Sequence, residues 1–132
     1  MKTIYYGPVY VYIASPYTKG DMARNVHHSL LVANTLIENG YTPFAPLLAH
    51  FQHMMFPQDY DTWLKLDMDW LAKCDVVLRM KKHLLTGEKL PESSGADKEV
   101  IFAGQKNIPV VESVEELLKR FPPVEDSLEL CC

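Results

Sequence analysis

The sequence predicts a single α/β domain in which a parallel sheet of four to five strands carries helices on both faces. Short β-branched and aromatic runs alternate with segments of helical periodicity along the chain, which is the pattern of successive strand and helix units. The chain has 132 residues, of which 48% are hydrophobic and 23% are charged. This length suffices for one domain with a real core and is too short for two ordinary domains.

The first half of the chain contains two expected strands and one expected helix. The run at 9–16 is β-branched and aromatic and ends at a proline, which is typical of a buried strand. Apolar residues recur at helical spacing over 22–37, and Gly40 is a natural helix stop. A short second strand is expected at 41–46. The segment 47–58 shows no clean periodicity, so we expect it to be a loop.

The second half continues the alternation. We expect a helix at 59–73, a strand at 74–80 and a polar loop at 81–92. A second helix at 94–104, a strand at 108–113, a last helix at 114–121 and a tail at 122–132 follow. Ser94 and Asp97 have the spacing of a capping box, which predicts a helix start. Residues 1–121 therefore form the expected domain, a Rossmann-like sandwich whose ligand crevice lies at the carboxyl ends of the strands.

Composition and motifs exclude several classes of protein. The formal net charge is −4 and no long basic run occurs, which argues against a protein whose task is to bind a nucleic-acid polymer. The apolar runs are too short to span a membrane and no secretory signal is visible, so we expect a cytoplasmic protein. Neither the three cysteines nor the five histidines have metal-ligand spacing, and both nucleotide-binding glycine motifs are missing. We therefore expect no metal and no cofactor.

An acid interrupts the apolar stripe of the expected helix at 59–73. Asp67 shares its helix face with four large apolar residues, namely Trp63, Leu64, Trp70 and Leu71. A carboxyl that faces a core finds a partner or keeps its proton, so we expect the pKa of Asp67 to be raised, which suits proton transfer. The alternative is a structural aspartate that bonds a neighbouring loop. Asp69 falls on the wet face beside Lys65.

A second acid faces inward on the next helix. Glu99 lies at the margin of the stripe formed by Ala96, Val100 and Ala103. Because it lies in the first turns, we expect the helix dipole and the exposed amides to keep it ionised, as a nucleophilic carboxylate requires. The alternative is an ordinary glutamate at a helix start.

The loops expected at the carboxyl ends of the strands are rich in polar residues. Ser93, Ser94 and Gly95 precede the helix of Glu99 and offer hydroxyls and free backbone N–H groups, which are the ingredients of an anion site. A simple N-cap is the alternative. The loop after the first strand and the region around His50 are expected to reach the same crevice.

Three stretches of the chain resemble one known family. They are "VYIASPYT", "LDMDWLAKCDVV" and "SSGADKEVIFAGQKNIPVV", and they occur in that order through about Val111. Together they resemble the nucleoside 2-deoxyribosyltransferase-like family, and within it the 2'-deoxynucleoside 5'-phosphate N-hydrolases. The middle stretch is the most specific of the three.

The resemblance assigns roles to both acids. It implies that Glu99 attacks C1' of the sugar and that Asp67 protonates the departing base. The tyrosine that positions the glutamate in this family corresponds to Tyr12, with Tyr10 as the other candidate in the same pattern.

The resemblance also bears on the substrate. Ser93 stands where the transferases carry an acid that holds the 5'-hydroxyl of the sugar, and a hydroxyl at a helix start can bond a 5'-phosphate that a carboxylate would repel. We expect Ser15 and Arg24 to complete the phosphate site, and Tyr17 to stack on the base or the sugar.

These expectations combine into one function. The protein is expected to be an N-glycosidase that cleaves the base–sugar bond of a (2'-deoxy)nucleoside 5'-monophosphate and releases free base and sugar 5-phosphate. Two alternatives stay open, a nucleoside 2-deoxyribosyltransferase that exchanges bases and a non-catalytic nucleotide-binding sensor. Since the relatives are dimers or larger, the resemblance also implies a homodimer or higher homo-oligomer.

Overall fold

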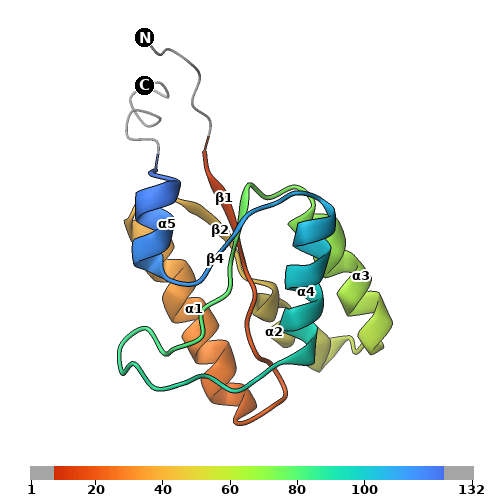
Figure 1. Cartoon of the computed structure of the whole chain (residues 1–132). Helices are drawn as coiled ribbons and strands as arrows, with labels where there is room; N and C mark the ends of the chain where they lie inside the picture. The colour runs from red at the N-terminus through yellow and green to blue at the C-terminus, as the bar shows by residue number, and fades with distance from the viewer. Residues whose placement is uncertain (1–7, 124–132) are drawn as a thin grey trace, which may run out of the picture.

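A computed structural model describes residues 8–123 and contains one sheet of four parallel strands among them (Figure 1). The strands are β1 (Tyr10–Ile13), β2 (Thr42–Phe44), β3 (Val76–Leu78) and β4 (Val110–Val111). The helices are α1 (Met22–Glu38), α2 (Ala49–Met55), α3 (Tyr60–Leu71), α4 (Ser94–Gln105) and α5 (Val114–Arg120), with a 3₁₀ turn at Pro46–Leu48. The predicted α/β class is confirmed. Residues 124–132, most of the expected tail, lie outside the described residues.

The order of the strands places a crevice between β1 and β3. The sheet runs β2-β1-β3-β4, so the chain first moves from β1 to β2 on one side and then crosses to β3 on the other. In register, Tyr12 pairs with Phe44 of β2 and with Val77 of β3. In open parallel sheets, the loops that leave the carboxyl ends of the strands separate at such a reversal and form a ligand site.

The two faces of the sheet bury different residues of β1. Val11 and Ile13 belong to a cluster that includes Leu36 of α1 and Leu117 of α5. Tyr12 points to the opposite face, into a second cluster formed with residues of α3 and α4. Figure 1 shows α1 and α5 on one side of the sheet and α3 and α4 on the other. The predicted arrangement with helices on both faces is therefore confirmed.

The segment 47–58 differs from its prediction as a loop. Most of it is helical, because the 3₁₀ turn leads directly into α2. No residue of α2 is buried, and Phe51, Met54 and Met55 are all exposed. The segment therefore lacks the core-facing stripe that makes a helix visible as a periodic pattern.

Helix α4 starts where it was predicted, but its N-cap is one residue earlier than expected. The helix begins at Ser94, but its N-cap is Ser93, whose side chain accepts a hydrogen bond from the backbone N–H of Ala96 (3.0 Å). The expected capping box of Ser94 and Asp97 is therefore wrong, and the simple N-cap alternative holds for Ser93.

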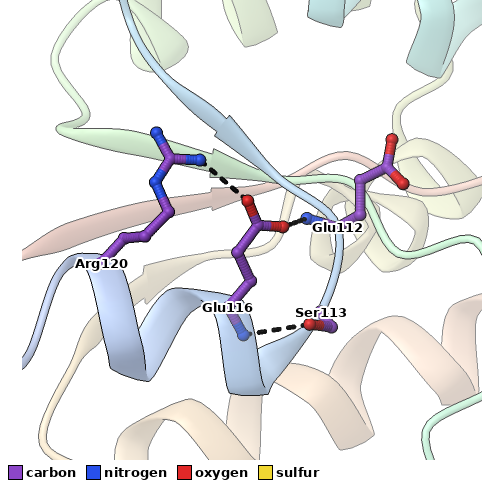
Figure 2. Close-up of polar contacts among 4 residues, drawn as sticks. All are labelled: Glu112, Ser113, Glu116 and Arg120. Carbon is purple, nitrogen blue, oxygen red and sulfur yellow. Dashed lines mark hydrogen bonds and ion pairs between the residues drawn. The ribbon is translucent and has the colours of Figure 1, made fainter.

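The last helix has a reinforced N-terminus. Ser113 caps α5 by accepting from the Glu116 N–H (3.0 Å), and the Glu116 carboxylate accepts from the Glu112 N–H (2.9 Å) (Figure 2). Arg120, one turn later, donates to the same carboxylate (2.8 Å). These bonds satisfy amides that a helix leaves free and fix α5 against the sheet. No helix within residues 8–123 is long and apolar enough to cross a membrane.

Candidate functional site

A pocket of about 740 Å³ opens at the carboxyl ends of β1, β2 and β3. Its walls come from the loops after these strands and from α2, α3 and α4. Five of the predicted site residues line it, namely Tyr17, His50, Asp67, Ser93 and Gly95. The crevice predicted from the alternation of strands and helices therefore exists, and three separate loops contribute to it.

Helix α3 brings Asp67 to the pocket. Trp63 lies one turn before it and also lines the pocket, whereas Leu71, one turn after it, is fully buried. Burial raises the pKa of Asp67 to about 6, as the sequence predicts for an acid in this stripe. Trp70 departs from the prediction, since it is 56% exposed and stacks on Phe44 with 5.4 Å between ring centroids.

Helix α4 holds Glu99 in the core. Its carboxyl group is bonded by the buried hydroxyl of Tyr12 and only 7% of the residue is exposed. Glu99 does not itself line the pocket, but Gly95, one turn earlier on the same face of α4, does. Tyr10 is 43% exposed. Of the two candidate tyrosines, Tyr12 is therefore the one that contacts the glutamate.

The protonation of Glu99 differs from the prediction that it stays ionised. Burial raises its pKa to about 8, and the charge of Asp67 adds to this effect. The Tyr12 hydrogen bond and the charge of Arg79 act in the opposite direction but do not offset burial. Glu99 lies beyond the first turn of α4, where the helix dipole has weakened. Burial likewise raises the pKa of Tyr12 far above its usual value, so Tyr12 remains the donor.

Near neutral pH Asp67 is therefore ionised and Glu99 is protonated, so the two carboxyls together carry one proton. Asp67 titrates near pH 6 and Glu99 near pH 8. Because the charge of Asp67 contributes to the raised pKa of Glu99, the two titrations are coupled. Between about pH 6 and pH 8 the site therefore contains one acid and one carboxylate.

Arg79 is a site residue that the sequence analysis did not identify. It follows β3, is only 4% exposed, and donates from Nη1 to the Met80 carbonyl oxygen (3.1 Å). Its Nη2 lies 3.7 Å from Oδ1 of Asp97, which lines the pocket, and its Nε has no partner within residues 8–123. An arginine directly after a buried strand, at the crevice end of the sheet, is the signal that could have revealed it.

Two histidines of α2 are tied to other elements by aromatic partners. Tyr17 and His50 lie 2.6 Å apart between the phenol oxygen and Nδ1. The Trp63 indole N–H donates to Nδ1 of His53 (2.7 Å). All four side chains line the pocket, and neither His53 nor Trp63 was predicted to be a ligand-binding residue.

The predicted phosphate ligands are only partly brought together. Ser93 and Gly95 line the pocket at the start of α4, and Lys19 and Lys98 line the same pocket. Ser15 is half-buried and does not line this pocket. Arg24 lines a separate hollow of about 500 Å³ with residues such as His28 and Lys89, so it does not belong to this site. Within residues 8–123, no group of three or more potential ligand side chains could hold a metal ion.

The burial of Glu99 predicts how the stability of the protein depends on pH. Its pKa rises from about 4.5 to about 8 on folding, so the folded state binds more protons than the unfolded state between these values. The free energy of unfolding should therefore fall as the pH rises through this range. Glu99→Gln removes this loss and should stabilise the protein on the order of 2 kcal/mol at pH 8.5, with much less gain at pH 5.

Chemical denaturation at several pH values measures this difference. Glu38→Gln, at an exposed position of α1, is the control and should change stability by about 0.5 kcal/mol or less at every pH. A gain from Glu99→Gln that does not grow with pH would contradict the buried carboxyl.

Comparison with known protein families identifies the family of the chain. No curated protein matches the chain. The model of a family described as a domain of unknown function (DUF7768) matches residues 9–113, more than three quarters of the chain. The matched stretch contains the whole sheet and every residue that lines the pocket. The chain belongs to this family, the domain of unknown function DUF7768.

Proposed function

We propose that the protein is an N-glycosidase that cleaves the base–sugar bond of (2'-deoxy)nucleoside 5'-monophosphates. One observation carries this proposal: the neighbouring helices α3 and α4 carry two carboxyls, Asp67 in the pocket wall and Glu99 one turn beyond the pocket-lining Gly95, and the charge of Asp67 contributes to the raised pKa of Glu99. Cleavage of a glycosidic bond needs one acid to protonate the leaving group and one carboxylate to meet the positive charge that develops at C1'.

The proposed reaction uses each carboxyl in turn. Asp67, in its protonated form, donates to the departing base as the C1'–N bond breaks, and the Glu99 carboxylate forms a bond to C1'. Water then attacks C1' and its proton passes to Asp67. The bond between C1' and Glu99 breaks, which restores the Glu99 carboxylate and releases the sugar 5-phosphate. A base that fills the pocket excludes water from Asp67 and raises its pKa further, which moves the shared proton from Glu99 to Asp67.

The start of α4 supports a monophosphate as substrate. The Ser93 hydroxyl accepts from Ala96 and can still donate its own proton, and the first amides of a helix have no intrahelical partner. Lys19 and Lys98 add positive charge, although Glu92 and Asp97 line the same pocket. Selection of a phosphate therefore rests on directed N–H and O–H donors more than on the net charge of the pocket.

Chromatography of the products from a panel of nucleosides and their 5'-monophosphates tests the proposal. We expect free base and sugar 5-phosphate from monophosphates. Asp67→Asn and Glu99→Gln should each lower kcat/KM by roughly 10²–10⁴-fold. Asp69→Asn is the matched control, because Asp69 lies two residues from Asp67 on the exposed face of α3, paired with Lys65 at 2.9 Å. It should keep wild-type activity.

Two other results would replace this proposal. Formation of a new nucleoside when a free base is added, with no sugar phosphate from monophosphates, would indicate base exchange. A rise in melting temperature with nucleotides but no free base after long incubation would indicate a nucleotide-binding protein without turnover.

The shared proton predicts a bell-shaped dependence of kcat/KM on pH. Activity should fall below about pH 6, where both carboxyls are protonated and no nucleophile remains, and above about pH 8, where no proton is left for the base. Tyr12→Phe removes a hydrogen bond that lowers the pKa of Glu99, so it should move the alkaline limb to higher pH. A value of kcat/KM that stays constant from pH 5 to pH 9 would contradict the proposed catalytic roles of Asp67 and Glu99.

We also propose that the protein forms a homo-oligomer through α2. This helix buries none of its residues, and Phe51, Met54 and Met55 are 51%, 68% and 73% exposed. Contiguous apolar surface of this kind marks an interface, and the same helix carries His50 and His53 of the pocket. A second copy on α2 would therefore also support the pocket wall.

Sedimentation velocity tests this assembly. Met55→Glu should convert an oligomer into a monomer, because it places a charge in the proposed contact. Leu85→Glu, at an equally exposed apolar position of the loop after β3, is the control and should leave the assembly intact. A wild-type protein that sediments as a monomer at micromolar concentration would end this proposal.

A further inference from the structure

His53 has a tautomer that its neighbours fix. Its Nδ1 accepts hydrogen bonds from the Trp63 indole N–H (2.7 Å) and from the backbone N–H of Gln58 (3.2 Å). Both partners are donors only, so Nδ1 must carry a lone pair, and the neutral ring has its proton on Nε2. Protonation of Nδ1 would break both bonds. The Nε2–H group is therefore a constant donor.

This donor is free to meet a ligand. Within the part of the chain that the structure describes, Nε2 of His53 makes no hydrogen bond, and the half-buried side chain lines the pocket. His50 differs, because its Nδ1 faces a Tyr17 hydroxyl that can either donate or accept. Of these two histidines, only His53 therefore has a ring nitrogen whose role as a donor is fixed by its hydrogen bonds.

His53 and Asp67 both line the pocket and are linked through Trp63. Trp63 holds His53, and Asp67 follows Trp63 by one turn on the same face of α3, about 5–6 Å away between Cβ atoms. Both residues line the pocket. A planar base whose reacting nitrogen lies at Asp67 would extend along this face, so that its edge reaches His53.

We propose that His53 selects the leaving base by donating from Nε2 to a carbonyl oxygen on that base. This inference rests on the proposed function and narrows its substrates to nucleotides whose base carries a carbonyl group, which includes oxopurines and pyrimidines. An aminopurine without a carbonyl would bring an N–H donor against the His53 donor and leave both unpaired.

Inosine and adenosine 5'-monophosphates, in ribose and deoxyribose form, are the matched pair of substrates, because their bases differ only at position 6, a carbonyl against an amino group, and at N1, which carries a proton in hypoxanthine and a lone pair in adenine. We expect wild-type kcat/KM to favour the hypoxanthine nucleotide by roughly 10–100-fold, the factor that an unpaired buried donor implies. His53→Gln keeps an amide N–H near the position of Nε2 and should retain most of this preference.

His53→Asn is the matched variant. Its shorter side chain can still accept a hydrogen bond from Trp63 near the position of Nδ1, but it places no donor in the pocket. The preference for the hypoxanthine nucleotide should therefore disappear. The loss should come from the hypoxanthine nucleotide, with the adenine rate little changed. Equal rates for both nucleotides in the wild type, or an unchanged preference in His53→Asn, would overturn the inference while the glycosidase proposal stands.

The inference is also testable if neither nucleotide is cleaved. In that case the affinity of wild type and His53→Asn for the two monophosphates, measured by calorimetry, decides the role of His53, and the glycosidase proposal fails only if no monophosphate of the panel is cleaved. We expect the wild type to bind the hypoxanthine nucleotide more tightly than the adenine nucleotide, and His53→Asn to bind both with similar affinity. ¹⁵N NMR of the imidazole should show the proton on Nε2 at neutral pH, and a proton on Nδ1 would refute the fixed donor.

Discussion

A hydrogen bond from the Tyr12 hydroxyl to the Glu99 carboxyl joins an interior strand of the sheet to α4. Both residues are buried in the layer between β1 and the helices α3 and α4, where a charged group is costly to hold. A neutral or apolar residue at position 99 would be easier to accommodate. A buried acid that lowers stability, one turn beneath a pocket-lining glycine, is the arrangement expected where an active site tolerates local instability for chemistry.

The fold assigns different environments to two chemically similar groups. Asp67 lines the pocket and is partly solvated, whereas Glu99 is enclosed by Tyr12 and the core, so burial raises the pKa of Glu99 further than that of Asp67. Arg79 directly follows β3 with its guanidinium beside Asp97, and its positive charge lowers the pKa of Glu99. The packing of α3 against α4 thus determines the electrostatics as well as the geometry of the pair.

Residues with periodic or local signals could be predicted, and those whose role depends on distant contacts could not. Asp67 stood out because it interrupts an apolar stripe and Glu99 because it lies at the margin of one, and the alternation of strands and helices located their crevice. The protonation of Glu99 depends on how completely Tyr12 and the core enclose it, which no local pattern encodes. Helix α2 was missed because it has no buried face, and the contact of His53 with Trp63 joins residues from two different elements.

The two walls of the pocket are consequently fixed by different physics. Helices α3 and α4 pack on the sheet through buried apolar residues such as Leu71 and Ala103, which hold the carboxyls rigidly. Helix α2 has no such anchor, and polar contacts through His50 and His53 join it to the rest of the site. A ligand that bonds these histidines acts on the same residues that position α2. Binding of a ligand to these histidines and attachment of α2 would therefore be coupled, and a partner that covered the exposed apolar face of α2 would stabilise this wall of the pocket from outside.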